Sequence, residues 1–313
     1  MNILIAGGAG YIGSRLVPAL QIRGHHVSVV DLCWFGNHLP EETGVSAIDV
    51  FELEAPMLRA YDVVVFLSGL SNDPMAEYSP SENFIQNGAA PAFLAYIAKQ
   101  AGVPRFVYAS SCSVYGFAGA VLSSESDRPN PGYPYGISKL QGEQAVLQQG
   151  DENFSVIALR KGTVSGWSPR MRLDLAINTM FKSAMKDGVI TVNNPDIWRP
   201  ILDINDAVQA YTRAIECFPE ISGVYNIASG NYQIGELAEA VKAAVGTTIK
   251  IDVKHVPDVR NYKVSTVRAQ AHLGFRPKGT VQTILRDLRN YEPLFRDWDN
   301  PQYYNIRVFR GER

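Results

Sequence analysis

Short runs of apolar residues alternate with longer amphipathic segments along the first half of the chain. The apolar runs indicate buried strands, and they cover residues 2–6, 27–31, 62–67, 104–109 and 154–160. The segments between them show helical periodicity, most clearly at residues 12–23, 83–100 and 135–149. This alternation of strands and helices predicts an α/β protein with a doubly wound parallel sheet and right-handed crossover connections.

After residue 166 the pattern changes, and the elements become shorter and more mixed. Helices are predicted at residues 173–186 and 206–217 and a strand at 224–228, while 190–200 has an irregular pattern and the last dozen residues have none. We expect residues 1–165, to which 201–228 return, to form the sheet domain. Residues 166–200 and 229–313 are then a smaller C-terminal α/β lobe that packs on it and leaves a cleft.

The charge balance narrows the possible partners. The 313 residues include 29 Lys and Arg against 31 Asp and Glu, a formal net charge of −2, which does not favour nucleic acid or an anionic membrane as a partner. No apolar run is long enough to span a bilayer. The three cysteines form no CxxC pair and fit a reducing, cytoplasmic location, and the five histidines lack the spacing of a metal site.

Three glycines lie between the first predicted strand and the first predicted helix. Gly7, Gly10 and Gly13 have the spacing GxxGxxG. Glycine permits the tight turn, lets the backbone approach a pyrophosphate and lets the helix pack close to the sheet, while the N-terminus of the helix faces the phosphates. The pattern at this place predicts a dinucleotide site, and a plain tight turn is the alternative.

An acidic residue, Asp31, closes the second predicted strand, 18 residues after Gly13. A carboxylate here accepts hydrogen bonds from both hydroxyls of the adenosine ribose and repels a 2′-phosphate, which favours NAD over NADP. Asp49 follows a third apolar stretch. We expect it either to bind the adenine amino group, with Val50 against the ring, or to be a solvated loop acid.

A tyrosine and a lysine, Tyr135 and Lys139, lie four residues apart on one face of a predicted helix, and the strand at 104–109 runs into Ser111. Both segments reach the carboxyl edge of the sheet, where open α/β folds bind ligands. A phenol of pKa ~10 is a poor base at neutral pH, but a nearby cation lowers that pKa. Lys139 and an oxidised nicotinamide both supply positive charge. We expect Tyr135 to take the proton from a hydroxyl as hydride leaves the same carbon, while Ser111 holds the oxygen.

Four features together carry a resemblance to a known family. They are GGAGYIG at residues 7–13, the strand-end Asp31, SSCSVYG at 110–116 and YGISK at 135–139. With family-like segments such as ENFIQNG, LRKGTVSG and WRPILDIND, the match runs from residue 1 to about residue 290. The chain resembles an extended short-chain dehydrogenase/reductase of the NAD-dependent epimerase/dehydratase family, whose members act on nucleotide sugars. The resemblance implies a Rossmann-type NAD-binding domain and a substrate-binding lobe.

The resemblance also implies binding roles for residues outside the catalytic set. Further contacts to NAD are implied for Tyr11, Ile12, Leu67, Ser68, Gly69, Asn87, Tyr135 and Lys139. Contacts to a nucleotide-diphosphate sugar are implied for Ser111, Ser113, Asn178, Arg199, Arg260 and Tyr262. Two arginines can clamp a diphosphate, and the alternative for each is a plain surface position. For Arg170 and Arg172 the sequence leaves a place in the substrate cleft and a surface ion pair equally open.

The chain departs from the family pattern at three informative places. Sugar 4,6-dehydratases of the family carry Asp-Glu directly after the catalytic Ser or Thr, where this chain has Cys112 and Ser113. Neither side chain can replace a carboxylic acid at neutral pH, so 4,6-dehydration is disfavoured. Lys161 stands where a proline is common in the family. We expect Cys112 to be a packed small side chain and not a reactive thiol.

We therefore predict an NAD-dependent nucleotide-sugar epimerase that oxidises a sugar carbon, most simply C4, and returns the hydride. One alternative is a nucleotide-sugar 4-dehydrogenase/ketoreductase, which would share every catalytic residue. The other is a non-catalytic NAD-binding scaffold or sensor, which an intact Ser, Tyr and Lys set disfavours. Family members commonly pair the helices at 83–100 and 135–149, which implies a homodimer. The apolar candidates for its seam are Phe84, Ala92, Leu94, Ala95, Ala98 and Leu147.

Overall fold

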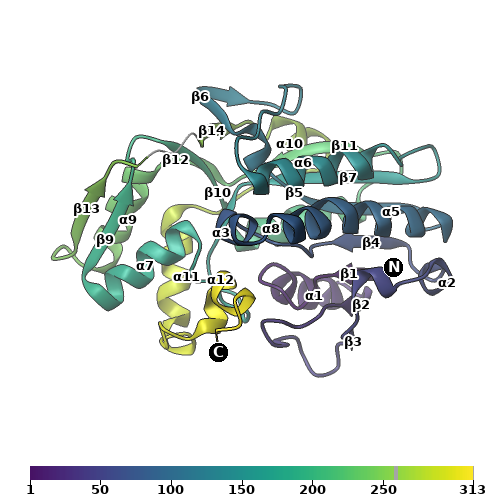
Figure 1. The fold of residues 1–313 in the computed structure, drawn as a ribbon, viewed down its shortest axis with the longest axis horizontal. Coiled ribbons are helices and arrows are strands. Elements are labelled where there is room, and N and C mark those ends of the chain that lie inside the picture. Colours follow the sequence, from purple (N-terminus) through teal and green to yellow (C-terminus); the bar gives the residue numbers. More distant parts are fainter. Residues whose placement is uncertain (257–259, 313) are drawn as a thin grey trace.

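A parallel sheet of seven strands forms the centre of the molecule (Figure 1). The computed structural model describes residues 1–256 and 260–312. The strand order is β11-β7-β5-β4-β1-β2-β3, and every neighbouring pair is parallel. These strands are β1 (Asn2–Ala6), β2 (His26–Val30), β3 (Val45–Ser46), β4 (Val63–Phe66), β5 (Arg105–Ser111), β7 (Ser155–Lys161) and β11 (Gly223–Ile227). The predicted α/β fold with a Rossmann-type sheet is confirmed.

Helices cover both faces of this sheet, because its strands are apolar on both sides. Ile3 and Ile5 of β1 belong to the core shared with α1 (Gly13–Ile22) and α8 (Ile204–Glu216). Leu4, which points to the opposite face, belongs to the core under α5 (Ala90–Gln100) and α6 (Pro134–Leu147). Consecutive strand residues therefore enter different cores, which explains why the strands are continuous apolar runs.

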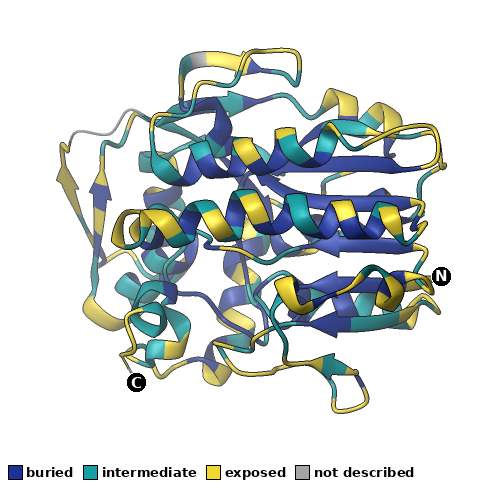
Figure 2. Cartoon of the chain, turned by 45° about the vertical axis from the view of Figure 1, so that its right-hand side comes forward, coloured by how far each residue is buried: buried dark blue, intermediate teal, exposed yellow. Residues whose placement is uncertain are grey.

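The long helix predicted at residues 83–100 begins earlier and is interrupted. It consists of α4 (Pro80–Phe84), a π-helical turn η2 (Ile85–Ala89) and α5. Leu94, Ala95 and Ala98 are fully buried against the sheet, as Figure 2 shows for the inward faces of the helices. They cannot supply a contact to a second subunit, because the intramolecular core already uses them.

A smaller lobe, at the left of Figure 1, contains α7, α9, α11 and two short strands. Its elements are α7 (Ala176–Asp187), β9 (Val189–Asn193), α9 (Ile234–Val245), β13 (Lys250–Lys254) and α11 (Val281–Tyr291). The prediction that residues 190–200 are irregular is wrong, since they contain β9 and the start of β10 (Trp198–Asp203). The alternate residues Ile190 and Val192 of β9 are buried, so a five-residue strand with one apolar face lies in this segment.

The remaining elements connect the two parts. They are η1 (Val50–Glu52), α2 (Ala55–Leu58), α3 (Asp73–Tyr78), η3 (Cys112–Tyr115), β6 (Phe117–Ser123), β8 (Thr163–Ser165), β12 (Gly230–Gln233), β14 (Asn261–Val264), α10 (Val267–His272), η4 (Glu292–Leu294), η5 (Pro301–Tyr303) and α12 (Asn305–Phe309). β10 pairs with β8 and β12, and β14 pairs with β6. Within the described part of the chain, no helix is long and apolar enough to cross a membrane.

The C-terminal segment folds back onto the sheet domain, although its sequence has no clear pattern. The ring of Phe309 in α12 stacks on Trp34 after β2 at 5.8 Å and meets the edge of Tyr78 in α3 at 5.9 Å. Arg310 lies over the same Tyr78 ring at 4.9 Å. These aromatic contacts are long-range in sequence, and they place α12 beside the carboxyl edge of the sheet.

Candidate active site

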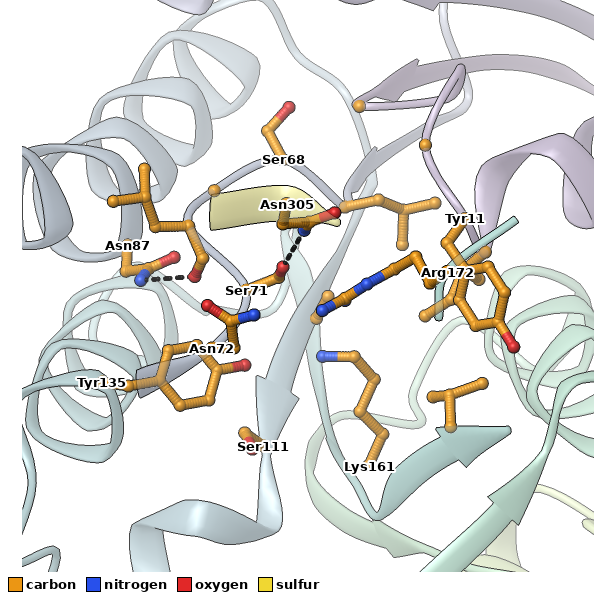
Figure 3. Close-up of a pocket in the computed structure, with 18 of the residues that line it drawn as sticks. Tyr11, Ser68, Ser71, Asn72, Asn87, Ser111, Tyr135, Lys161, Arg172 and Asn305 are labelled. Atoms are coloured by element: carbon orange, nitrogen blue, oxygen red, sulfur yellow. Dashed lines mark hydrogen bonds between the residues drawn. The ribbon is translucent and has the colours of Figure 1, made fainter. Parts of the chain in front are cut away.

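One cavity runs along the carboxyl edge of the sheet and extends toward the smaller lobe. It is lined by residues that end or directly follow β1, β2, β4, β5 and β7, among them Gly7, Asp31, Leu67, Ser111 and Lys161. Figure 3 shows several of its lining side chains converging from these separate strands. The topology explains this, because all parallel strands end at the same edge, where ligands of open α/β folds bind.

The glycine turn after β1 forms the floor of one half of the cavity. Gly7 has a φ of +82°, and a Cβ added there would lie 2.5 Å from the backbone nitrogen of Ser68. A Cβ on Gly13 would lie 2.2 Å from the carbonyl oxygen of Gly8. No side chain fits at either position, so the turn stays tight and a phosphate can approach the backbone at the N-terminus of α1. Gly10, Tyr11 and Ile12 also line this part.

The acid predicted to bind the adenosine ribose, Asp31, lines the same half. One carboxylate oxygen accepts from the backbone N–H of Ala9 at 3.0 Å and the other from that of Cys33 at 2.8 Å. Burial raises the pKa of Asp31, which these two hydrogen bonds partly offset. Asp49 caps η1 by accepting from the N–H of Phe51 at 2.9 Å, and Val50 is buried beside it. Both line the cavity next to Asp31.

The end of β4 supplies the opposite wall. Leu67, Ser68 and Gly69 line the cavity together with Asn87 of η2. The amide nitrogen of Asn87 donates to the carbonyl of Leu70 at 2.9 Å, but its buried Oδ1 has no hydrogen-bond partner within the part of the chain described. A buried acceptor without a donor is costly, and a ligand hydroxyl or amide would satisfy it. This orphaned oxygen and the glycine floor fit NAD.

The structure brings the three predicted catalytic residues together. Ser111 ends β5, and Tyr135 lies in the first turn of α6 with Lys139 one turn later. A hydrogen bond joins Ser111 and Tyr135. Lys139 is buried, and its Nζ lies 4.5 Å above the ring of Tyr108. The close approach of β5 and α6 explains how residues so distant in sequence reach one point.

The pKa of Tyr135 differs from the sequence-based expectation. Burial raises it to about 12, although the hydrogen bond with Ser111 lowers it, and Lys139 is not among its causes. Burial, with repulsion from Lys161, also holds the pKa of Lys139 well below its usual value. The charges of the protein alone therefore do not make Tyr135 a good base. An oxidised nicotinamide in the cavity would supply the missing positive charge.

A buried ionic network holds α6 against the sheet directly behind these residues. Glu143 accepts from Ser110 at 2.6 Å and from two nitrogens of Arg160 at 2.9 and 2.6 Å. The Nη1 of Arg160 donates to the hydroxyl of Tyr115 at 2.8 Å. Because Ser110 precedes Ser111 and Glu143 lies one turn after Lys139, the network joins the two segments that carry the chemistry.

Four of the residues implied for substrate binding line the other half of the cavity: Ser113, Arg199, Arg260 and Tyr262. The hydroxyls of Ser113 and Tyr262 lie 3.4 Å apart, and the guanidinium of Arg199 lies 5.6 Å from the centre of the Tyr262 ring. Arg260 forms an ion pair with Asp73 and lies over Tyr133 at 5.0 Å.

Asn178 has a different environment. It is fully buried and is not a lining residue. Its Oδ1 accepts from the N–H of Gly166 at 3.0 Å, and its amide nitrogen donates to the hydroxyl of Tyr11 at 3.1 Å and to the carbonyl of Arg172 at 2.8 Å. This pattern gives Asn178 a role in holding the loop after β8 against the glycine turn.

Several lining residues have no counterpart in the sequence-based prediction. Asn305, at the start of α12, donates to the hydroxyl of Ser71 at 2.6 Å (Figure 3) and accepts from Arg170. Arg170 also packs over Phe35 at 3.9 Å. No local signal marks Asn305, since its contacts are with residues more than a hundred positions away. Arg170 and Arg172 are both buried and line the cavity, so neither is a surface position, although Arg172 also forms an ion pair with Asp174.

Comparison with known proteins gives the family and its cofactor. A model of the NAD dependent epimerase/dehydratase family matches residues 3–228. The chain is 27% identical to a UDP-glucose 4-epimerase of Erwinia amylovora, over 96% of this chain and 99% of that one. It is 29% identical to a GDP-6-deoxy-D-mannose reductase of Pseudomonas aeruginosa, over 76% of this chain and 81% of the relative.

Solved structures agree with this result. The structure titled MoeE5 in complex with UDP-glucuronic acid and NAD matches with a TM-score of 0.83 and 28% identity, over 94% of this chain and 100% of that one. The UDP-glucose 4-epimerase of Thermus thermophilus, solved with NAD, matches with a TM-score of 0.80 and 23% identity, over 92% and 98% of the two chains. The predictions of NAD as cofactor and of a nucleotide-sugar epimerase class are confirmed, and the chain belongs to the NAD-dependent epimerase/dehydratase family of extended short-chain dehydrogenases/reductases.

Proposed function

We propose that this protein is an NAD-dependent 4-epimerase of UDP-sugars. The observation that supports the proposal is that Ser111, Tyr135 and Lys139 line the same cavity as the glycine turn. The curated relatives named UDP-glucose 4-epimerase and UDP-arabinose 4-epimerase support the nucleotide and the position. NAD, when bound, accepts a hydride from the sugar carbon and returns it.

In this mechanism Tyr135 accepts the proton of the sugar hydroxyl as the hydride leaves the carbon that bears it. Ser111 donates a hydrogen bond to the same sugar oxygen and keeps it next to the phenol. Lys139 orients the cofactor ribose and, when charged, stabilises the phenolate. Tyr135 would give the proton back to the same oxygen when the carbon is reduced again, and inversion requires the ketone to turn its opposite face toward the cofactor. The same residues thus act in both directions.

We further propose that Arg199 and Arg260 bind the diphosphate of the substrate, with Ser113 and Tyr262 beside it. Guanidinium groups match the planar oxygen pairs of a diphosphate. The backbone carbonyl of Arg260 accepts from Arg199, which keeps the two side chains on one wall of the cavity. Substitution of either arginine by methionine should weaken UDP binding.

The residue after Ser111 argues against dehydration. Cys112 is 1% exposed, and its thiol donates to the carbonyl of Arg160 at 3.1 Å. Burial raises the pKa of this thiol far above its ordinary value. Cys112 is therefore neither an acid nor a base at neutral pH, and Ser113 adds no carboxylate. The two positions after Ser111 therefore supply no carboxylic acid for the elimination of water.

The test is direct turnover with NMR detection. The purified protein is incubated with UDP-glucose, UDP-glucuronate and UDP-N-acetylglucosamine, and the C4 epimer is followed by proton NMR. Epimer should form without net NADH, and Tyr135→Phe should abolish it. Accumulation of NADH with a released keto product would instead identify a dehydrogenase. The absence of any reaction, with UDP still bound, would contradict the proposal.

The division into domains and the assembly are also part of the proposal. β11 lies in the main sheet, which supports returning residues 201–228 to the domain formed by 1–165, with 166–200 and 229–313 as the substrate lobe. We propose a homodimer through the outer faces of α5 and α6, where Tyr96 is 56% exposed. Light scattering at micromolar concentration tests it. Three free cysteines, Cys33, Cys112 and Cys217, fit the proposed cytoplasmic location.

A further inference from the structure

Two cationic side chains that the mechanism does not use, Lys161 and Arg172, lie beside the reacting groups. Lys161 ends β7 directly across from Ser111 in β5, since the register pairs these two residues. Arg172 belongs to the loop between β8 and α7. Figure 3 shows both side chains pointing into the space next to Ser111 and Tyr135, with their charged ends facing each other.

Lys161 has no acidic partner. Its Nζ donates one hydrogen bond, to the carbonyl of Ser110 at 2.9 Å. Among residues 1–256 and 260–312, no carboxylate lies within ion-pair distance of it. Two of its three N–H groups therefore have no hydrogen-bond partner among the described residues, and the side chain lines the cavity. Burial lowers the pKa of Lys161 to about 8, and repulsion from Arg172 adds to this effect. The ammonium thus lacks a counter-ion.

Arg172 is only partly neutralised. Asp174 occupies its Nε at 2.8 Å and its Nη2 at 3.1 Å. Its Nη1 has no hydrogen-bond partner among the residues that the structure describes. Asp174 also accepts from Asn72 at 3.1 Å and from the backbone N–H of Asn305 at 3.2 Å, so its charge is shared among several donors. One donor of the guanidinium fork stays available on the cavity side.

The charge of the whole neighbourhood is positive. Lys139 is a third basic side chain here; burial lowers its pKa, and repulsion from Lys161 contributes to this effect. Glu143, the acid that acts on Lys139, is committed to Arg160 and Ser110, and Asp174 pairs with Arg172, so neither neutralises Lys161. An oxidised nicotinamide in the cavity would add a further positive charge. Clustered cations in a buried site are stable only when an anion joins them.

We propose that the substrate sugar carries a carboxylate that binds between Nζ of Lys161 and Nη1 of Arg172, so that the substrate class is the nucleotide-hexuronates. This inference rests on the proposed function, because it uses the sugar position that Tyr135 defines. When the C4 hydroxyl is at Tyr135, a carboxylate on C5 is two bonds from C4 and falls beside it. Its two oxygens match the two separate donors. The diphosphate is bound elsewhere, by Arg199 and Arg260.

The experiment measures binding without turnover. NAD-loaded full-length protein with Tyr135→Phe is titrated calorimetrically with UDP, UDP-glucose and UDP-glucuronate. UDP-glucuronate should bind roughly tenfold more tightly than UDP-glucose, or better, because hydrogen bonds between charged groups are the strong ones. The added substitution Lys161→Met should bring the ratio of the two affinities to about one, while Lys161→Arg should keep most of it.

The control is Lys254→Met, because Lys254 is an exposed lysine on β13 that does not line the cavity, and it should leave the ratio unchanged. Equal affinity of the unsubstituted Lys161 protein for both sugars would overturn the inference. Equal weakening of both sugars by Lys161→Met would also overturn it, since it would indicate a general structural role. In either case normal UDP binding, together with C4 epimerisation by the wild-type protein, would leave the proposed function intact. Failure to bind UDP would refute the proposed function itself.

Discussion

Substitution of Glu143 by glutamine tests whether the ionic network behind the active site holds the sheet and α6 together. The side chains of Glu143 and Arg160 are 2% and 5% exposed, so neither charge has water as an alternative partner. Glu143→Gln leaves the Arg160 charge buried and uncompensated. Breaking a buried pair by removing one partner costs about 3–5 kcal/mol.

The expected change in melting temperature follows from the chain length. With an unfolding entropy of about 2.1 cal/mol/K per residue, 313 residues have roughly 0.66 kcal/mol/K. The loss of stability then corresponds to a fall in Tm of about 5–8 °C. Calorimetry with saturating NAD gives this value directly. Activity should fall as well, because α6 carries Tyr135 and Lys139.

Two further variants test whether the unpaired buried charge causes the loss of stability. Glu143→Leu with Arg160→Met removes both charges, and its Tm should lie closer to the wild type than that of Glu143→Gln, because no unpaired charge remains. Asp151→Asn breaks an ion pair with Lys99 that is exposed on both sides, and it should leave Tm nearly unchanged. A fall of less than about 2 °C for Glu143→Gln would show that the buried pair does not stabilise this region.

The remaining predictions concern cofactor and catalysis. Tyr135→Phe keeps the ring and removes the titrating oxygen, so kcat should fall by roughly 10²–10⁴ while the Kd of UDP stays the same; near-normal turnover would remove Tyr135 from the mechanism. Asp31→Asn removes the charge that faces the ribose, and calorimetry should show tighter NADP binding; an unchanged preference for NAD would argue that other residues choose the cofactor. Asn305→Ala breaks the contacts of α12 with Ser71 and Arg170, and the Kd of NAD should rise about tenfold in equilibrium dialysis; a Kd equal to that of the wild type would limit α12 to a structural role.

The parallel sheet and the cofactor half of the site could be predicted from the sequence, because both depend on local signals. Residues 2–6 are a short apolar run that is followed by glycines and an amphipathic helix. These flanking signals identify the run as a buried strand. The glycine spacing reports directly on backbone geometry, and the Cβ positions at Gly7 and Gly13 show why. Tyr135 and Lys139 share a helix face through their spacing alone.

Side-chain pKa values and the partners of apolar helix faces could not be predicted from the sequence, because both depend on what surrounds each side chain in the tertiary structure. Burial raises the pKa of Tyr135 to about 12, where the sequence favoured a lowered value. The face of α5 that contains Leu94 would be apolar whether it packed on the sheet or on a second subunit. Only the tertiary structure shows that it packs on the sheet.

The sugar end of the cavity is the part of the site that could least be predicted from the sequence. Lys161 and Arg172 come from a strand end and a loop, and no spacing in the sequence relates them. Their charge matters only when they share one poorly solvated cavity, since the same cations on a surface would be screened by water. The catalytic residues can therefore be predicted from sequence motifs. The residues proposed to select the sugar cannot, because only the fold brings them together.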